Sequence, residues 1–151
     1  MKYQYTSKGF KDNLIPPSFT LPSGVKFLLI INIAVFILVE LSGQKNDFFL
    51  SFGLVPSFVW TKLKIWQLFT YLFIHGSFFH IFFNMFVLWM FGKDLENQWG
   101  TKELLNFYFA CGIGAGFMTV LFGTNSIIPI VGASGAIYGL LVAYGFTYPN
   151  R

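Results

Sequence analysis

The sequence predicts an all-α, polytopic membrane protein with four transmembrane spans, and three observations support that fold class. The 151 residues are 55% hydrophobic and only 11% charged, whereas a soluble domain carries about 25% charged residues. The mean hydropathy of +0.62 agrees with this composition. The apolar residues also fall into separate runs of about the length that a bilayer core roughly 30 Å thick requires.

The positive net charge does not indicate a nucleic-acid partner. The chain carries a charge of +4, but its ten lysines and arginines are scattered singly and form no basic cluster. Cys111 is the single cysteine, so no internal disulfide can form. No set of ligand residues has the spacing of a metal site, and we expect neither a metal nor an organic cofactor.

The first element is a tail, and a span follows it. Residues 1–24 are polar and contain three prolines, which predicts a poorly ordered segment. The apolar run 25–41 begins beside Lys26 and ends at Glu40, as expected for a first span whose charged ends reach the interface. A cleaved signal peptide is the weaker alternative, because no small-x-small cleavage site follows Glu40.

Residues 44–92 are apolar, but they do not form one straight transmembrane span. Residues 44–64 are too apolar for a loop in water and, with Pro56 in the middle, too short to cross the bilayer, so we expect them to lie in the interface. The apolar run 65–92 is longer than one span needs. The sequence His75-Gly76-Ser77 predicts a break, with Ser77 capping a second span at 78–92.

The remaining elements alternate between polar connections and spans. A charged connection covers 93–102, and a third span is expected at 104–122. Its glycines at 112, 114 and 116 favour close helix packing. A short turn at 123–129 leads to a fourth span at 134–148.

The distribution of basic residues predicts the orientation. Seven lie on the side of the two termini and three on the other, so the positive-inside rule places both termini in the cytoplasm. The seven are Lys2, Lys8, Lys11, Lys26, Lys93, Lys102 and Arg151, and the three are Lys45, Lys62 and Lys64. We expect an integral, multi-pass protein of a bacterial cytoplasmic membrane.

Polar side chains gather at the outer ends of the second and fourth spans. His80 and Asn84 are one helical turn apart and share a face. Ser134 begins the fourth span among glycines, and Tyr138 follows it by one turn. These groups would face one cavity that opens outward. The plainer interpretation is that His80 and Asn84 hydrogen-bond a neighbouring helix and that the glycines serve packing.

Taken together, three motifs resemble the rhomboid intramembrane serine proteases. They are HGSFFHIFFN at 75–84, DLENQWG at 94–100 and GASGAIYG at 132–139, within a matching block from residue 66 to residue 145. The resemblance implies a rhomboid-like helical bundle of six spans, of which four are present here. It also implies a serine endopeptidase that cleaves transmembrane-helix substrates inside the lipid bilayer, and it identifies residues 44–74 as the membrane-embedded first loop.

The resemblance assigns roles to the residues of the outer cavity. Ser134 is similar to the rhomboid nucleophile, and His80 and Asn84 are similar to the pair that faces the oxyanion. Gly132 and Gly135 are similar to the glycines that shape the backbone of the oxyanion hole. With the amide N–H of Ser134, the Asn84 amide and a neutral His80 ring would supply the donors that amide hydrolysis needs.

Further positions follow from the same resemblance. Tyr138 is similar to the tyrosine that packs against the catalytic imidazole. His75, Glu96 and Gly100 are expected to have structural roles. Gln67 stands where many members have arginine, so an interaction made by that arginine is not carried over.

The general base is not accounted for. In rhomboids it is a histidine on the sixth span, and this sequence has no histidine after His80. Three explanations are open: the chain is a fragment of a longer protease, His80 is itself the base, or the protein is a non-catalytic relative that binds transmembrane helices. We favour the fragment, because the sequence stops where the fourth span ends while every other motif is intact. His80 as base is less attractive, because it would then leave the oxyanion side. We expect little or no activity from these 151 residues alone.

Overall fold

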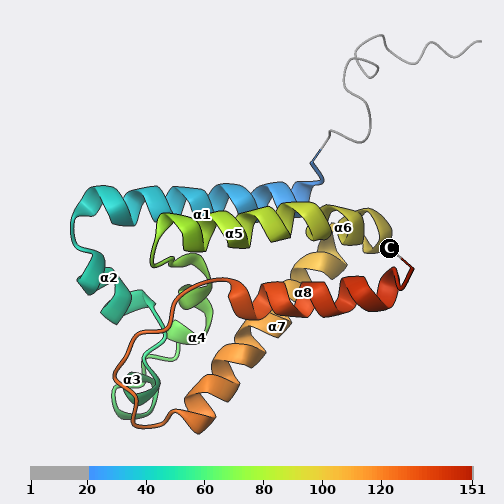
Figure 1. The fold of residues 1–151 in the computed structure, drawn as a ribbon. Coiled ribbons are helices and arrows are strands. Elements are labelled where there is room, and N and C mark those ends of the chain that lie inside the picture. Colours follow the sequence, from blue (N-terminus) through green and yellow to red (C-terminus); the bar gives the residue numbers. More distant parts are fainter. Residues whose placement is uncertain (1–20, 151) are drawn as a thin grey trace, which may run out of the picture.

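The computed structural model describes residues 21–150 and builds them almost entirely from helices (Figure 1). Within that range the β structure is one isolated bridge, between Leu54 and Ile130. The predicted all-α fold is therefore confirmed. Most of the expected tail, residues 1–20, lies outside the described residues, as does residue 151.

Two long helices lie side by side along one edge of the molecule (Figure 1). They are α1 (Ser23–Ser42) and α5 (Phe78–Val87), and α5 continues through a π-helical turn, η3 (Leu88–Gly92), into α6 (Lys93–Trp99). Ser77 caps α5 as predicted, since its hydroxyl accepts a hydrogen bond from the backbone N–H of His80 (3.2 Å). The helical run extends to Trp99, seven residues beyond the expected end of the second span.

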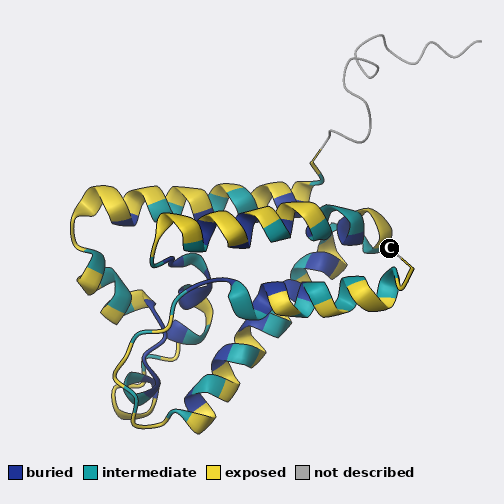
Figure 2. Cartoon of the chain, in the orientation of Figure 1, coloured by how far each residue is buried: buried dark blue, intermediate teal, exposed yellow. Residues whose placement is uncertain are grey.

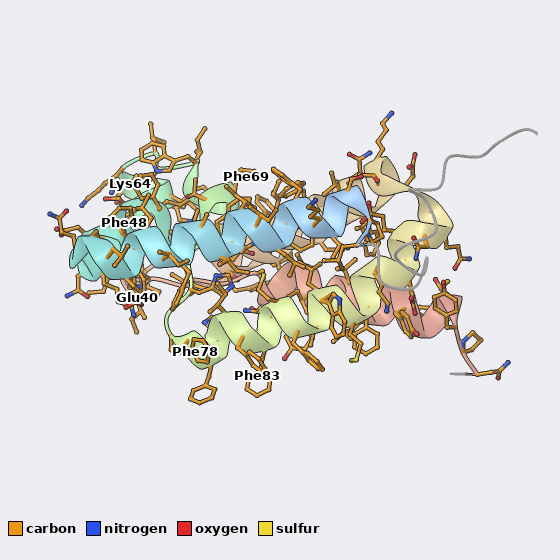
Figure 3. All side chains as sticks on the ribbon, turned by 90° about the horizontal axis from the view of Figure 1, so that it is seen from above. Glu40, Phe48, Lys64, Phe69, Phe78 and Phe83 are labelled. Carbon is orange, nitrogen blue, oxygen red and sulfur yellow. The ribbon has the colours of Figure 1, made fainter. Side chains whose placement is uncertain are left out.

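The outer faces of these helices are apolar and open. Figure 2 shows α1 and α5 with exposed residues along their outward sides, and Phe79 is 69% exposed. In Figure 3, Phe78 and Phe83 point away from the rest of the bundle. Rows of exposed aromatic side chains on long apolar helices suit hydrocarbon surroundings, not water.

Helix α7 (Thr101–Phe122) packs closely against α8 (Ser134–Thr147). A Cβ at Gly139 of α8 would lie 2.5 Å from Sγ of Cys111, so glycine permits this contact. Gly112 and Gly116 of α7 do not serve helix packing alone, because they also face residues of the 3-10 turn at 71–73. A Cβ at Gly112 would lie 2.7 Å from the side chain of Leu72.

The helix lengths do not fix the number of transmembrane spans. Among the described residues, α1 and α7 are long and apolar enough to cross a membrane by themselves. The helical pair 67–73 and 78–99 qualifies only jointly and is bent by 93°, while α8, at 14 residues, is shorter than a straight span needs. The expected count of four spans is not confirmed.

The segment 45–73 folds into four short helices that fill the space between α1 and α7. They are α2 (Lys45–Phe52), α3 (Pro56–Thr61), α4 (Gln67–Thr70) and the 3-10 turn η2 (Tyr71–Phe73). Side chains at the start of α4 bind carbonyls that the last turn of α2 leaves free. Trp66 donates to the carbonyl of Ser51 (3.0 Å), and the Gln67 amide donates to that of Leu50 (2.9 Å).

The connection 123–133, which leads into α8, is hydrogen-bonded to the 45–73 segment along its backbone. Leu54 and Ile130 exchange two hydrogen bonds of 2.8 Å, and the N–H of Ser57 donates to the carbonyl of Ser126 (3.0 Å). Because these bonds satisfy backbone groups of both stretches, the connection is held in one conformation although it has no regular structure.

Glu96 ties the beginning of α1 to the turn between α6 and α7. Its carboxylate accepts hydrogen bonds from the N–H groups of Gly24 and Val25 (2.7 Å each) and from the hydroxyl of Thr101 (2.6 Å). A carboxylate at a helix N-terminus also interacts favourably with the helix dipole. Gly100 closes the same turn at φ +92°, a conformation that favours glycine.

Candidate active site

Ser134 lies at the first turn of α8, half-buried. The first N–H groups of a helix have no intrahelical partner and carry partial positive charge, so a helix start is suited to stabilising an anion. Gly132, two residues earlier, has φ +114°, which requires glycine. Its N–H donates to the carbonyl of Tyr71 (2.9 Å), so Gly132 contributes space to the site and not a donor.

The second-span pair lies directly against this glycine. A Cβ at Gly132 would lie 2.5 Å from Nε2 of His80 and 3.6 Å from Nδ2 of Asn84. The fold therefore brings His80, Asn84 and the backbone before Ser134 to one place. Any side chain at position 132 would displace the imidazole.

Asn84 presents a donor that the fold does not use. The residue is only 7% exposed, and its Nδ2 has no hydrogen-bond partner among residues 21–150. A buried amide without a partner costs on the order of 1–3 kcal/mol. Four other residues in that range also bury polar atoms without a partner: Asn32, Ser57, His75 and Tyr108. Of the five residues, only Asn84 and His75, which packs against His80, lie near Gly132.

His75 is buried behind the pair, in the turn before α5. Its ring packs edge-on against that of His80, with the ring centroids 5.2 Å apart. Burial lowers the pKa of His75 to about 4, the nearby His80 adds to the lowering, and a backbone contact with Phe73 opposes it. Both ring nitrogens of His75 are buried without a hydrogen-bond partner among residues 21–150.

Two further residues of the expected site lie at its edge. Tyr138 is 69% exposed on the open side of α8. Gly135 faces α7, because a Cβ there would lie 2.7 Å from the Cβ of Ala115 and 3.4 Å from the hydroxyl of Tyr71. Gly135 therefore contributes to helix packing beside the site.

Gln67, which stands where many rhomboids have arginine, is fully buried and hydrogen-bonded. Its Oε1 accepts from the N–H of Val55 (3.1 Å), while its Nε2 donates to the carbonyl of Leu50. A neutral amide can both donate and accept, so it joins two parts of the 45–73 segment without a buried charge. Sequence reasoning missed this role, and it missed Tyr71. The available signal was a polar group in an apolar run, which needs a partner.

This arrangement can stabilise an oxyanion but lacks an evident base. A carbonyl placed at Ser134 would meet the helix N–H groups, with the Asn84 amide on the opposite helix. His80 lies on that same side, against Gly132. The sequence contains two histidines, and the other, His75, is buried in the turn.

Comparison with known proteins relates the chain to a single family. The family model of the rhomboid domain matches residues 62–151. The rhomboid protease GluP of Bacillus subtilis is 30% identical over 124 residues, which cover 81% of this chain and 24% of that protein. Chloroplastic rhomboid-like protein 11 of Arabidopsis thaliana is 29% identical over 131 residues, 86% of this chain and 43% of that protein. Inactive rhomboid-like protein 8 of the same plant is 34% identical over 80 residues, 53% and 22% of the two chains.

The chain thus spans less than half the length of these relatives. One of these relatives is named a protease and another is named inactive. The comparison therefore supports an integral membrane protein of the rhomboid type, but it does not show whether this chain is catalytic. They also include a chloroplastic protein, and the expected bacterial membrane receives no support from them.

Proposed function

The chain belongs to the rhomboid family, and we propose that it supplies the nucleophile and the oxyanion site of a serine endopeptidase that cuts transmembrane substrates within the bilayer. The observation that carries the proposal is the unpaired, buried Nδ2 of Asn84 beside Gly132, at the entrance to the helix that begins with Ser134. Within the described part of the chain, buried polar atoms without a partner also occur at Asn32, Ser57, His75 and Tyr108, so it is the place of Asn84 beside Gly132 that supports the proposal.

Each residue has a role in the proposed reaction. The Oγ of Ser134 attacks the carbonyl carbon of the scissile peptide bond, and its proton passes to a general base. The carbonyl oxygen becomes an oxyanion that accepts hydrogen bonds from the Ser134 N–H, the Asn84 amide and the His80 ring. The base then protonates the leaving amine, and water releases the acyl group from Ser134.

We assign the base to neither histidine of the sequence. His75 is buried in the turn, and His80 is needed on the oxyanion side, where its Nε2 lies against Gly132. The proposed base is a histidine contributed from beyond these 151 residues, as the family resemblance implies. By the same family analogy, the substrates are transmembrane helices that contain small, helix-weakening residues.

A non-catalytic rhomboid-like protein that binds transmembrane helices is the second candidate. The similarity to a relative named inactive favours it, since that relative is 34% identical over 80 residues. In this case the apolar face of α5 would bind the partner helix, and Ser134 would remain unreactive.

The orientation is proposed together with the function. Both termini are placed in the cytoplasm, as the positive-inside rule predicts, so the site opens to the outer side. A cysteine introduced at Ser126, in the connection before α8, should react with a membrane-impermeant maleimide added to intact cells. If that cysteine is labelled only after the cells are opened, the connection lies in the cytoplasm and the proposed orientation is wrong.

Fluorophosphonate labelling of the protein extracted from its own membrane separates the two candidates. A catalytic protein is labelled at Ser134 and cleaves a transmembrane reporter, and Ser134→Ala abolishes both. Ser126→Ala, which removes a hydroxyl from the neighbouring connection, should leave both unchanged. Absence of labelling in a folded protein, or cleavage that persists in Ser134→Ala, refutes the protease proposal.

A further inference from the structure

Tyr71 lies where three parts of the site's framework meet. Its backbone carbonyl accepts the N–H of Gly132 in the 123–133 connection (2.9 Å), and its hydroxyl donates to the carbonyl of Gly112 in α7 (2.6 Å). The residue is 4% exposed. A Cβ at Gly116 of α7 would lie 3.0 Å from its ring, and one at Gly135 of α8 would lie 3.4 Å from its hydroxyl.

These contacts link the conformation of Gly132 to helix α7. Gly132 has a φ of +114°, which glycine adopts without strain, and the hydrogen bond to Tyr71 holds its N–H in a fixed direction. The side chain of Tyr71 has two torsions and a rigid ring. Anchoring its hydroxyl on α7 therefore also restricts the position of the Tyr71 backbone carbonyl. In low-dielectric surroundings both hydrogen bonds are stronger than in water.

We propose that Tyr71 is a positioning residue for the nucleophile: it sets the backbone at Gly132, and through it the placement of Ser134 relative to Asn84. This inference rests on the proposed function and adds to it a residue of the 45–73 segment. Tyr71 acts through Gly132 and touches no reacting atom. Its hydroxyl contact with Gly112 is the part that a single substitution can remove.

Tyr71→Phe and Tyr108→Phe form a matched pair of variants. Tyr108 is also buried and lies one turn before Gly112 on α7, but its hydroxyl has no hydrogen-bond partner among residues 21–150. Each substitution removes one buried hydroxyl and leaves the ring in place, but only Tyr71→Phe also removes a hydrogen bond, so Tyr71→Phe should cost more stability. Only Tyr71→Phe should affect the site.

Two readouts test the inference on protein extracted from its own membrane. In Tyr71→Phe, kcat for a transmembrane reporter should fall about tenfold with KM within about twofold, because loss of the hydrogen bond to Gly112 releases Tyr71 from α7 and displaces the nucleophile but not the surface that binds the substrate. Amide hydrogen exchange in the peptide that covers 130–136 should also become faster, by a factor on the order of ten. Tyr108→Phe should change neither quantity.

The outcomes separate this inference from the proposed function. Unchanged exchange in the 130–136 peptide of Tyr71→Phe, or equal changes in both variants, overturns the positioning role. Faster exchange in Tyr71→Phe alone supports the positioning role. If Ser134 of the unaltered protein is also unreactive, the proposed function is refuted while the positioning role stands. Thermal unfolding of the two variants provides the measure of stability against which both readouts are compared.

Discussion

Replacing Glu96 by alanine should loosen the start of α1 from the rest of the molecule. The carboxylate binds the N–H groups of Gly24 and Val25 and the hydroxyl of Thr101, and all of these contacts are 2.7 Å or shorter. Glu96, Gly24 and Val25 are buried, so water does not replace the lost acceptor. In Glu96→Ala, two backbone donors are left without partners.

The expected loss of unfolding free energy follows from these contacts. A buried donor without a partner costs about 1–3 kcal/mol, and loss of a carboxylate at a helix N-terminus adds about 0.3–1 kcal/mol. The two N–H groups and the dipole together give about 2–7 kcal/mol, against a typical total stability of about 5–15 kcal/mol. At about 2–4 °C per kcal/mol for a chain of this size, the melting temperature should fall by at least about 5 °C.

Thermal unfolding in detergent micelles, followed by tryptophan fluorescence, measures this loss. Glu96→Gln keeps one acceptor oxygen and should fall between the alanine variant and the unaltered protein. Glu103→Ala removes an exposed acidic residue from the first turn of α7, so only its interaction with the helix dipole is lost and stability should change by less than about 1 kcal/mol. The reasoning is refuted if Glu96→Ala and Glu103→Ala melt at the same temperature.

Three further predictions concern the site and its support. Asn84→Ala should lower kcat on the order of a hundredfold with KM little changed, because one oxyanion donor is lost, and an unaltered rate of Ser134 labelling would contradict this. Because burial lowers the pKa of His75 from 6.5 to about 4, the unfolded chain binds this proton first as the pH falls. Between pH 7 and pH 5 the unaltered protein should therefore lose about 2 kcal/mol more stability than His75→Gln, as measured by thermal unfolding at both pH values. Gly112→Ala should destabilise the fold by about 1–3 kcal/mol, since its Cβ would overlap Leu72, whereas Gly114→Ala, which faces open space, should be neutral or stabilising by up to about 1 kcal/mol.

The parts of the fold that follow from local chemistry could be predicted from the sequence. The break before α5 has a signal, because Ser77 offers a capping hydroxyl directly before an apolar run. The proximity of His80 and Asn84 follows from helical spacing alone. Both predictions depend on residues that are neighbours in the chain.

The parts that depend on distant partners could not be predicted. Nothing local to Gln67 or Tyr71 indicates that one binds Val55 and the other binds Gly132 and Gly112. Gly112 was expected to serve helix packing, but it also faces the turn that contains Leu72. A glycine permits close approach without indicating which element approaches.

The hydrogen bonds between the 45–73 segment and the 123–133 connection also have a consequence for the order of synthesis. At about 5–20 residues per second, Gly132 is made roughly 3 to 12 seconds after Tyr71. Throughout that interval the backbone N–H and carbonyl of Leu54 lack their partner Ile130, and the carbonyl of Tyr71 has only the local N–H of Ile74. Unpaired backbone groups are costly in hydrocarbon. We therefore expect the backbone of Leu54 to remain hydrated until the 123–133 connection has been made and can pair with it.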